Sequence, residues 1–267
     1  MCQIESPFAT ALREEEEELS FEPTGGIFEV KFLLTEEAML ALTECARQHL
    51  APDPHAMSAE GDGYTVHSLY LDDEQFATYF ATGTERLPKY RIRRYGDAET
   101  VFLERKSKPD GKVKKHRTLV NANDLAYLDG VEPPEDWSGR WFRKRMRKRG
   151  LHPVCFISYN RTARLGQIED QYVRFTLDKD ILCTPAQNME LPGPLNGEAT
   201  RLDTMIAEIK FEHSLPAPFA EVVERLSLVP APVSKYKRGV EACSLVSALL
   251  EGVAHKNGVG GDDLGAN

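Results

Sequence analysis

The segment KYRIRRYGDAETVFLERK, residues 89–106, alternates its side chains with the two-residue period of β-strands. Residues two apart in a strand share a face, so Arg91 and Arg93 point one way while the apolar residues beside them point the other. Glu104 and Lys106 repeat this alternation after a Gly-Asp turn signal. The segment therefore predicts two antiparallel strands with one apolar face and one face that is mostly cationic.

The same alternation recurs in other predicted strands. Their polar positions are Glu29 and Lys31, Lys115 and Arg117, Tyr159 and Arg161, Arg174, Thr176 and Asp178, and Glu208 and Lys210. One such strand alone is typical of a half-exposed sheet with a solvated outer face. The strands taken together need a different explanation.

Residues 86–117 hold twelve Lys and Arg against four Asp and Glu. Cations on adjacent strands repel one another unless a polyanion neutralises them. Arg offers bidentate contacts to phosphate oxygens and Lys offers a point charge. We therefore expect the polar faces to line a shared interior that binds a chain of phosphates.

The expected fold class is α+β, an eight-stranded, mainly antiparallel β-barrel with a polar cationic interior and helices packed outside. Periodicity and turn signals predict strands over 27–34, 63–71, 89–95, 100–108, 113–120, 154–163, 172–182 and 204–212, and helices over 35–50, 135–149, 217–226 and 240–251. Pro109-Asp110-Gly111 predicts a hairpin turn. We expect a disordered acidic arm over residues 1–26, one domain over 27–253 and a disordered tail over 254–267.

Composition excludes several classes of protein. The 267 residues carry a net charge of −9, but residues 1–26 alone hold seven acids against one base, so the overall charge is compatible with a cationic site. No run reaches the roughly 18 to 20 apolar residues of a membrane span, and the acidic N-terminus is unlike a signal peptide. The five cysteines form no CxxC pair, which indicates a reduced, cytoplasmic protein without a disulfide framework or structural zinc.

Six short motifs follow one another along the chain: Tyr90-Arg-Ile-Arg-Arg-Tyr95, Phe102-Leu-Glu-Arg-Lys106, the strand with Lys115 and Arg117, Val173-Arg-Phe-Thr-Leu-Asp178, Glu208-Ile-Lys210 and Ser234-Lys-Tyr-Lys237. Together, over about residues 27 to 250, they resemble the catalytic domain of the VTC (vacuolar transporter chaperone) family. Its members are polyphosphate polymerases within the triphosphate tunnel metalloenzyme superfamily. The resemblance implies an antiparallel tunnel in which the γ-phosphate of ATP is transferred to a growing polyphosphate chain.

The resemblance also implies roles for individual residues. The residues expected to grip phosphates during catalysis are Lys31, Arg91, Arg93, Lys106, Lys115, Arg161, Arg174 and Lys235. Those expected to bind substrate are Arg117, Tyr159, Lys210 and Ser234. Glu208 is the expected ligand of Mn²⁺ or Mg²⁺, since such an ion needs only one or two carboxylates beside water and phosphate. Glu104 would orient neighbouring cations or ligate metal, and Glu29 would pair with Lys31.

The first predicted strand separates two branches of the superfamily. The thiamine-triphosphatase and class IV cyclase branch begins with ExExK, whereas this chain has Ile27 at the first position and keeps only Glu29-Val-Lys31. This difference favours the VTC branch. Two other functions stay open: a tripolyphosphatase or nucleoside triphosphatase of the same tunnel type, and a non-catalytic protein that binds polyphosphate.

The expected partners are ATP and polyphosphate, and no DNA. The sequence lacks the family's inositol-phosphate-sensing domain and its membrane helices, so any coupled export would need a separate membrane partner. The segment 140–149 has seven Lys and Arg in ten residues and no acid. A solvated helix face is the default reading of this segment, and guidance of polyphosphate at the tunnel mouth is the functional alternative, with nucleic-acid contact less favoured.

Overall fold

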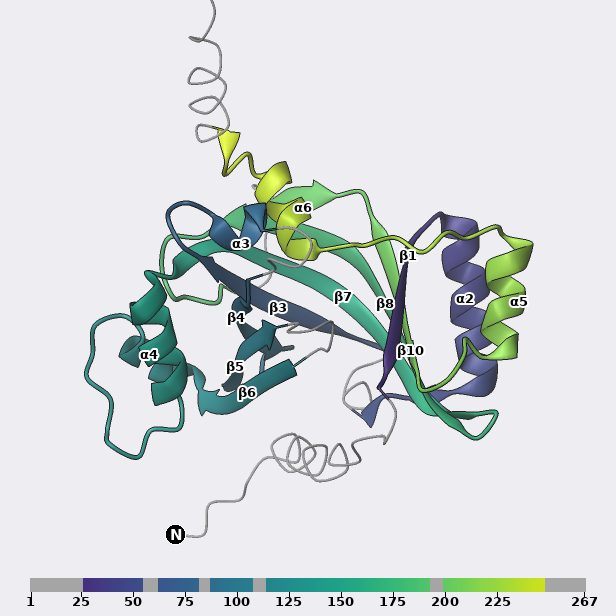
Figure 1. Ribbon diagram of the computed structural model, residues 1–267, viewed down its shortest axis with the longest axis horizontal. Helices are drawn as coiled ribbons and strands as arrows, with labels where there is room; N and C mark the ends of the chain where they lie inside the picture. Colours follow the sequence, from purple (N-terminus) through teal and green to yellow (C-terminus); the bar gives the residue numbers. More distant parts are fainter. Residues whose placement is uncertain (1–25, 55–61, 82–86, 108–113, 193–198, 248–267) are drawn as a thin grey trace, which may run out of the picture.

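A single antiparallel sheet of ten strands forms the centre of the protein (Figure 1). The computed structural model describes residues 26–54, 62–81, 87–107, 114–192 and 199–247. The strand order is β1-β10-β8-β7-β3-β4-β5-β6, with β2 paired to β7 and β9 paired to β8. The strands are β1 (Phe28–Leu34), β2 (Ala51–Pro52), β3 (Gly63–Asp72), β4 (Lys89–Tyr95), β5 (Thr100–Ser107), β6 (Lys114–Asn121), β7 (His152–Ile168), β8 (Gln171–Pro185), β9 (Thr200–Leu202) and β10 (Met205–Phe211).

The helices are short and lie mostly at the two sides of the sheet. They are α2 (Glu36–His49), α3 (Ala77–Phe80), α4 (Arg140–Arg149), α5 (Ala217–Arg225) and α6 (Lys235–Ala242), and a 3-10 helix, η4, covers Ala122–Tyr127. Thr35 caps α2 as predicted, because its hydroxyl accepts a hydrogen bond from the backbone N–H of Ala38 at 3.3 Å. No helix in the described part of the chain is both long and apolar enough to cross a membrane.

The predicted α+β class and all eight predicted strands are confirmed, although β7 ends at Ile168 rather than at residue 163. The predicted number of strands is wrong, because the short strands β2 and β9 pair with β7 and β8 and bring the total to ten. Two helix boundaries are wrong. Helix α4 begins at Arg140 rather than at residue 135, because the ring of Trp137 folds over Gly139, where a Cβ atom would lie 2.4 Å from that ring. Helix α6 begins at Lys235 rather than at residue 240, and the predicted end of that helix falls outside the described residues, as do the predicted hairpin turn and both predicted disordered ends.

Two apolar clusters cover the outer face of the sheet. Helices α2 and α5 pack on β1, β8 and β10, where Phe175 stacks on Phe219 with ring centroids 5.8 Å apart. Helix α4 packs on β4 and β5, where Phe142 meets the edge of Tyr90 at 5.7 Å. The burial of these faces leaves the opposite face of the sheet, called the inner face below, to the polar residues of the alternation.

Helix α6 lies on the inner face, which differs from the prediction that all helices pack outside. Tyr236 stacks on Tyr70 of β3 at 5.3 Å, and its hydroxyl donates to buried Asp72 at 2.5 Å. Gly239 allows the close approach, since a Cβ atom there would lie 2.9 Å from both Cys155 and Ile157 of β7. This helix therefore closes one end of the inner face.

The sheet curls, but a closed barrel is not confirmed. Strands β1 and β6 end the pairing order, and no pairing joins them in the described residues. Side chains nevertheless meet across the curl, because Lys106 Nζ of β5 lies 3.6 Å from Glu29 Oε2 of β1. The far edge of β1 is also covered, since Lys31 C=O accepts a hydrogen bond from Ala231 N–H at 2.8 Å. This curled inner face, which charged side chains span, is called the trough below.

Candidate functional site

Strand register brings the predicted phosphate-binding residues onto one face. Residues directly opposite in an antiparallel pair share a face. The opposed pairs are Lys31 with Glu208, Lys210 with Arg174, Asp178 with Arg161, Arg91 with Glu104, Glu104 with Arg117, and Lys106 with Lys115. The inner face therefore collects residues from seven strands, which extend from β1 to β10 along the sequence.

Three lysines form a row across neighbouring strands, called the lysine row below. Lys89 of β4 lies opposite Lys106 of β5, which lies opposite Lys115 of β6. Burial lowers the pKa of all three side chains, to about 8 for Lys89, which also lies near the cations Lys31 and Lys106. Like charges directly opposite one another destabilise a sheet, so the lysine row is suited to an anion that would neutralise it.

Two carboxylates hold the buried arginines in place. Glu104 is only 2 % exposed and accepts from Arg91 Nε at 2.5 Å, while its other oxygen lies 3.1 Å from Lys115 Nζ. Burial would raise the pKa of Glu104, but Arg91, Arg93 and Lys115 outweigh it and hold the pKa well below its usual value. Glu104 therefore orients cations, which is the first of its two predicted roles.

Asp178 does the same at the other side of the trough. Its oxygens accept from Arg161 Nε and Nη2 at 2.7 and 2.8 Å, and Lys235 at the start of α6 pairs with it as well. Burial raises the pKa of Asp178, but Arg161 and Lys235 hold it at about 2. The position of Asp178 in the strand alternation was visible in the sequence, but its bond to α6 was not.

Glu208 lies among cations and beside a second carboxylate. Its two oxygens lie 3.2 Å from Lys31 Nζ and 3.1 Å from Lys210 Nζ, and Lys31 also contacts Glu29 at 2.6 Å. Burial raises the pKa of Glu208, but Lys210 and Lys31 keep it well below its usual value, so the carboxylate is ionised at neutral pH. The predicted pairing of Glu29 with Lys31 is present.

The residues around Glu208 fit a divalent cation held partly by substrate. No group of three or more His, Cys, Asp or Glu gathers within the described residues in a way that would hold a metal unaided. Mg²⁺ needs only one or two protein carboxylates when phosphate and water supply the other ligands. Glu208 and Glu29, both next to Lys31, match that smaller requirement.

Two hydroxyl groups on the inner face are available to hydrogen-bond with a ligand. Tyr159 Oη and Thr176 Oγ1 are buried and have no hydrogen-bond partner among the described residues. The Tyr159 ring lies between cations, with Arg161 Cζ 5.4 Å and Lys235 Nζ 4.8 Å from its centroid. A buried polar atom without a partner is costly, so an oxygen-rich ligand beside these groups would be favoured.

The remaining predicted residues are partly engaged by the protein itself. Arg174 donates to Asp53 at 2.7 Å, Arg93 donates to Ser68 at 3.1 Å, and Arg117 lies over the ring of Phe102 at 4.7 Å. Ser234 caps α6 and accepts a hydrogen bond from Lys89 Nζ at 2.9 Å. Sequence reasoning missed Lys89, although its place two residues before Arg91 is a signal, and missed Asp53, for which the sequence gives no signal.

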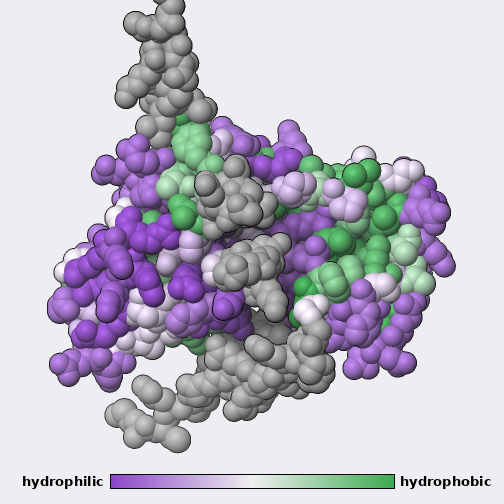
Figure 2. Space-filling model, viewed as in Figure 1, coloured by the Kyte–Doolittle hydropathy of each residue, from purple (hydrophilic) through white to green (hydrophobic). Residues whose placement is uncertain are grey.

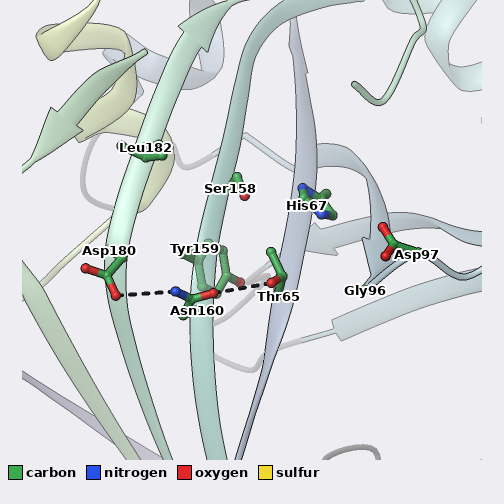
Figure 3. A pocket seen from close by; sticks show the side chains of 9 residues that line it. All are labelled: Thr65, His67, Gly96, Asp97, Ser158, Tyr159, Asn160, Asp180 and Leu182. Carbon is green, nitrogen blue, oxygen red and sulfur yellow. Dashed lines mark hydrogen bonds between the residues drawn. The ribbon is translucent and has the colours of Figure 1, made fainter. Parts of the chain in front are cut away.

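A pocket of about 250 Å³ lies on the other face of the sheet, away from these cations (Figure 3). Thr65, Asn160 and Asp180 cross its floor on three adjacent strands, joined by hydrogen bonds of 3.3 Å each. Most of its residues alternate with those of the inner face along β3, β7 and β8. The pocket therefore lies on the opposite face from the cations, and Tyr159 is the residue that it shares with the candidate site.

Comparison with known proteins supports the resemblance seen in the sequence. The chain matches the VTC domain family over residues 27–244, which is most of its length. No curated protein sequence matches it.

Several solved structures are similar at low sequence identity. A Bacillus halodurans protein named as an adenylate cyclase is 15% identical, with a TM-score of 0.46, over 80% of this chain and 97% of that one. A Hippeastrum protein, named as an adenylyl cyclase with a dominant triphosphatase activity, is 13% identical, with a TM-score of 0.43, over 79% and 92% of the two chains. Likenesses at this level do not transfer an activity.

Proposed function

This chain belongs to the VTC domain family, and on that premise we propose that it is an ATP-dependent polyphosphate polymerase. The observation that carries the proposal is the lysine row together with the arginines beside it, a concentration of cations on one face that protein carboxylates only partly neutralise. A linear chain of phosphates along the trough would supply the missing negative charge.

In the proposed reaction, a terminal oxygen of the acceptor polyphosphate attacks the γ-phosphorus of ATP. One P–O bond forms, the bond to the β-phosphate oxygen breaks, and ADP leaves, so the acceptor gains one phosphate. Phosphoryl transfer of this kind depends on positioning and on cations where charge develops, with little covalent chemistry by the protein. A bound Mg²⁺ or Mn²⁺ would supply charge neutralisation between the phosphates.

The inner-face residues would have different roles in this reaction. Lys31, Arg91, Arg93, Lys106, Lys115, Arg161, Arg174 and Lys235 would grip the reacting phosphates, with Arg117, Tyr159, Lys210 and Ser234 binding along the chain. Glu208, supported by Glu29, would hold the metal. Glu104 and Asp178 would keep the arginines and Lys235 in fixed positions, which limits the reorganisation needed during transfer.

We also place this activity in the cytoplasm. The cysteines Cys45, Cys155, Cys183 and Cys243 are all free thiols, as expected for a reducing compartment where ATP is abundant.

The test is incubation of the purified protein with ATP and Mn²⁺, followed by separation of the products by gel electrophoresis. Long polyphosphate chains, with one ADP released for each phosphate added, are the expected result. Orthophosphate without chains would show a triphosphatase instead, and tight phosphate binding without turnover would show a binding protein. Either of those results would overturn the polymerase proposal.

A further inference from the structure

Helix α4 presents an unusual concentration of unpaired positive charge. Its apolar residues Phe142 and Met146 are buried in the core, and Arg143 is buried and pairs with Glu132 at 2.7 Å. Arg140 is exposed as well, but it donates to the carbonyls of Pro133 and Pro134. The other exposed cations form what is called the α4 basic face: Lys144, Arg145, Arg147 and Lys148. None of them makes an ion pair or side-chain hydrogen bond within the described residues.

This concentration of positive charge destabilises the isolated helix, so its presence on α4 needs an explanation. Cations three or four residues apart repel, as Lys144 and Lys148 do, and a merely solvated helix normally mixes both signs. The helix is held instead by its packing, in which Trp141 stacks on His116 at 3.8 Å and donates to Thr118 at 2.8 Å. Packing against the core therefore stabilises a helix whose exposed cations repel one another.

The α4 basic face continues from the candidate site around one edge of the sheet. Strand β6 ends the pairing order, with Lys115 and Arg117 pointing to the inner face. Lys114 and His116 alternate with them and point outward, where α4 packs. Figure 1 shows α4 on the side of the molecule that carries β4, β5 and β6, and Figure 2 shows that this side is largely hydrophilic, whereas apolar residues gather on the side of α2 and α5.

We propose that the α4 basic face is a second binding surface for polyphosphate, which holds the chain after it leaves the trough and crosses the edge of β6. This inference rests on the proposed function and adds a site outside the trough. A ten-residue helix is about 15 Å long, so its exposed cations can contact several successive phosphates.

The chemistry of α4 favours polyphosphate over two other polyanions. Proteins that hold single-stranded nucleic acid offer aromatic rings for base stacking, but the rings of Trp141 and Phe142 pack against the protein. Helices that lie on membranes insert apolar side chains, yet every apolar residue of α4 faces the core or the sheet. A polyanion without bases or acyl chains fits best.

The test compares long and short polyphosphate. The variant Lys144→Gln/Arg147→Gln/Lys148→Gln removes three charges from α4, and Lys179→Gln/Arg201→Gln/Arg225→Gln removes three exposed charges elsewhere as a matched control. Binding is measured by titration with tripolyphosphate, which fits the trough alone, and with chains of on the order of 100 phosphates, at several salt concentrations.

The α4 variant should bind tripolyphosphate with unchanged affinity and long chains about tenfold more weakly. Its slope of log affinity against log salt for long chains should be smaller by about 2, since each phosphate contact releases counterions. The control variant should match the wild type in both measurements.

Unchanged long-chain affinity in the α4 variant, or an equal loss in the control, would overturn the inference even where tripolyphosphate binds normally. Loss of binding to double-stranded DNA or to anionic lipid vesicles as large as the loss for long polyphosphate would also overturn it, in favour of a general polyanion or membrane surface. Failure of the proposed function is a different result: the wild type would then form no polyphosphate chains from ATP, whatever the α4 variant binds.

Discussion

Glu208 is the residue of the site with the most specific surroundings, because Lys31 and Lys210 keep its carboxylate ionised beside a second carboxylate, that of Glu29. The change Glu208→Gln keeps its size but removes the charge that a divalent ion needs. We expect turnover to fall by at least about a hundredfold, while tripolyphosphate affinity stays the same or rises because Lys31 and Lys210 lose a competing anion. Steady-state kinetics with ATP and equilibrium binding measure the two effects separately.

The matched control for this change is Glu212→Gln. Glu212 lies just beyond β10 and accepts from the backbone N–H of Tyr172, away from the lysines. Its variant should keep wild-type turnover. Full activity in Glu208→Gln would remove this residue from the metal site.

Lys89 makes phosphate binding dependent on pH. Burial lowers its pKa from 10.5 to about 8, so the protonated form is lost as the pH rises through 8. Since the bound anion favours the charged lysine, tripolyphosphate affinity should decrease between about pH 7 and 9. Isothermal titration across this range should show the decrease in the wild type and a much flatter profile in Lys89→Met; parallel profiles in the two proteins would contradict the assignment.

For single residues, the sequence predicted the face of the sheet on which a side chain lies better than it predicted the residue that this side chain contacts. Alternation placed Arg91, Arg161 and Lys210 on a common side, because a strand has only two faces. It did not show that Asp53 would reach Arg174, since those residues are separated by more than a hundred positions and meet only through folding.

Among the elements, α6 connects the site to the core, and the Tyr236 hydroxyl is one of the groups that hold it there. Tyr236 Oη donates to Asp72, a carboxylate with no exposure, and Lys235 beside it reaches Asp178. We expect Tyr236→Phe to lower the free energy of unfolding by about 1.5 to 3 kcal/mol, the range for a buried hydrogen bond to a charged group. Urea denaturation measures this change.

Tyr79→Phe is the control for α6. Tyr79 also donates to a carboxylate, Glu241, but at 3.3 Å and in an exposed position. Its loss should cost less than about 0.5 kcal/mol. Equal effects of the two changes would show that the bond to Asp72 does not hold α6 in place.

Helix boundaries were the least predictable feature at this level. The pattern after Val240 suggested a helix, yet Ser234 begins it earlier because its hydroxyl accepts the N–H of Lys237. The motif Ser234-Lys-Tyr-Lys237 therefore forms the start of α6 as well as one side of the candidate site. Strands β7 and β8 run longer than predicted because they pair with each other along most of their length.

For the whole molecule, charges that favour phosphate binding should lower the stability of the ligand-free protein. At pH 7 Lys89 is charged and partly buried beside other cations, so Lys89→Met should raise the free energy of unfolding without ligand by about 1 kcal/mol. A ligand adds stability that grows with the logarithm of its concentration over Kd, about 2.7 kcal/mol at a hundred times Kd. Thermal melts with and without tripolyphosphate should therefore show a higher Tm for the free variant and a smaller ligand-induced rise.

The global architecture was predictable up to the closure of the sheet. The number of alternating segments and their short connections implied an antiparallel sheet with one polar face. Closure depends on side chains and edges that alternation does not encode, such as the contact of Lys106 with Glu29. A Tm of ligand-free Lys89→Met below that of the wild type would contradict the prediction that the charge of Lys89 lowers stability.

Strand β1 takes both of its neighbours from the far end of the chain, β10 on one side and the residue Ala231 on the other. While the protein is being synthesised, this first strand must therefore wait, unpaired, until those residues have left the ribosome. The exposed backbone of a waiting strand is open to wrong partners, and a domain with such distant pairing folds slowly. Nascent chains should then acquire protease resistance in this part of the sheet only after residues 205–231 have left the ribosome.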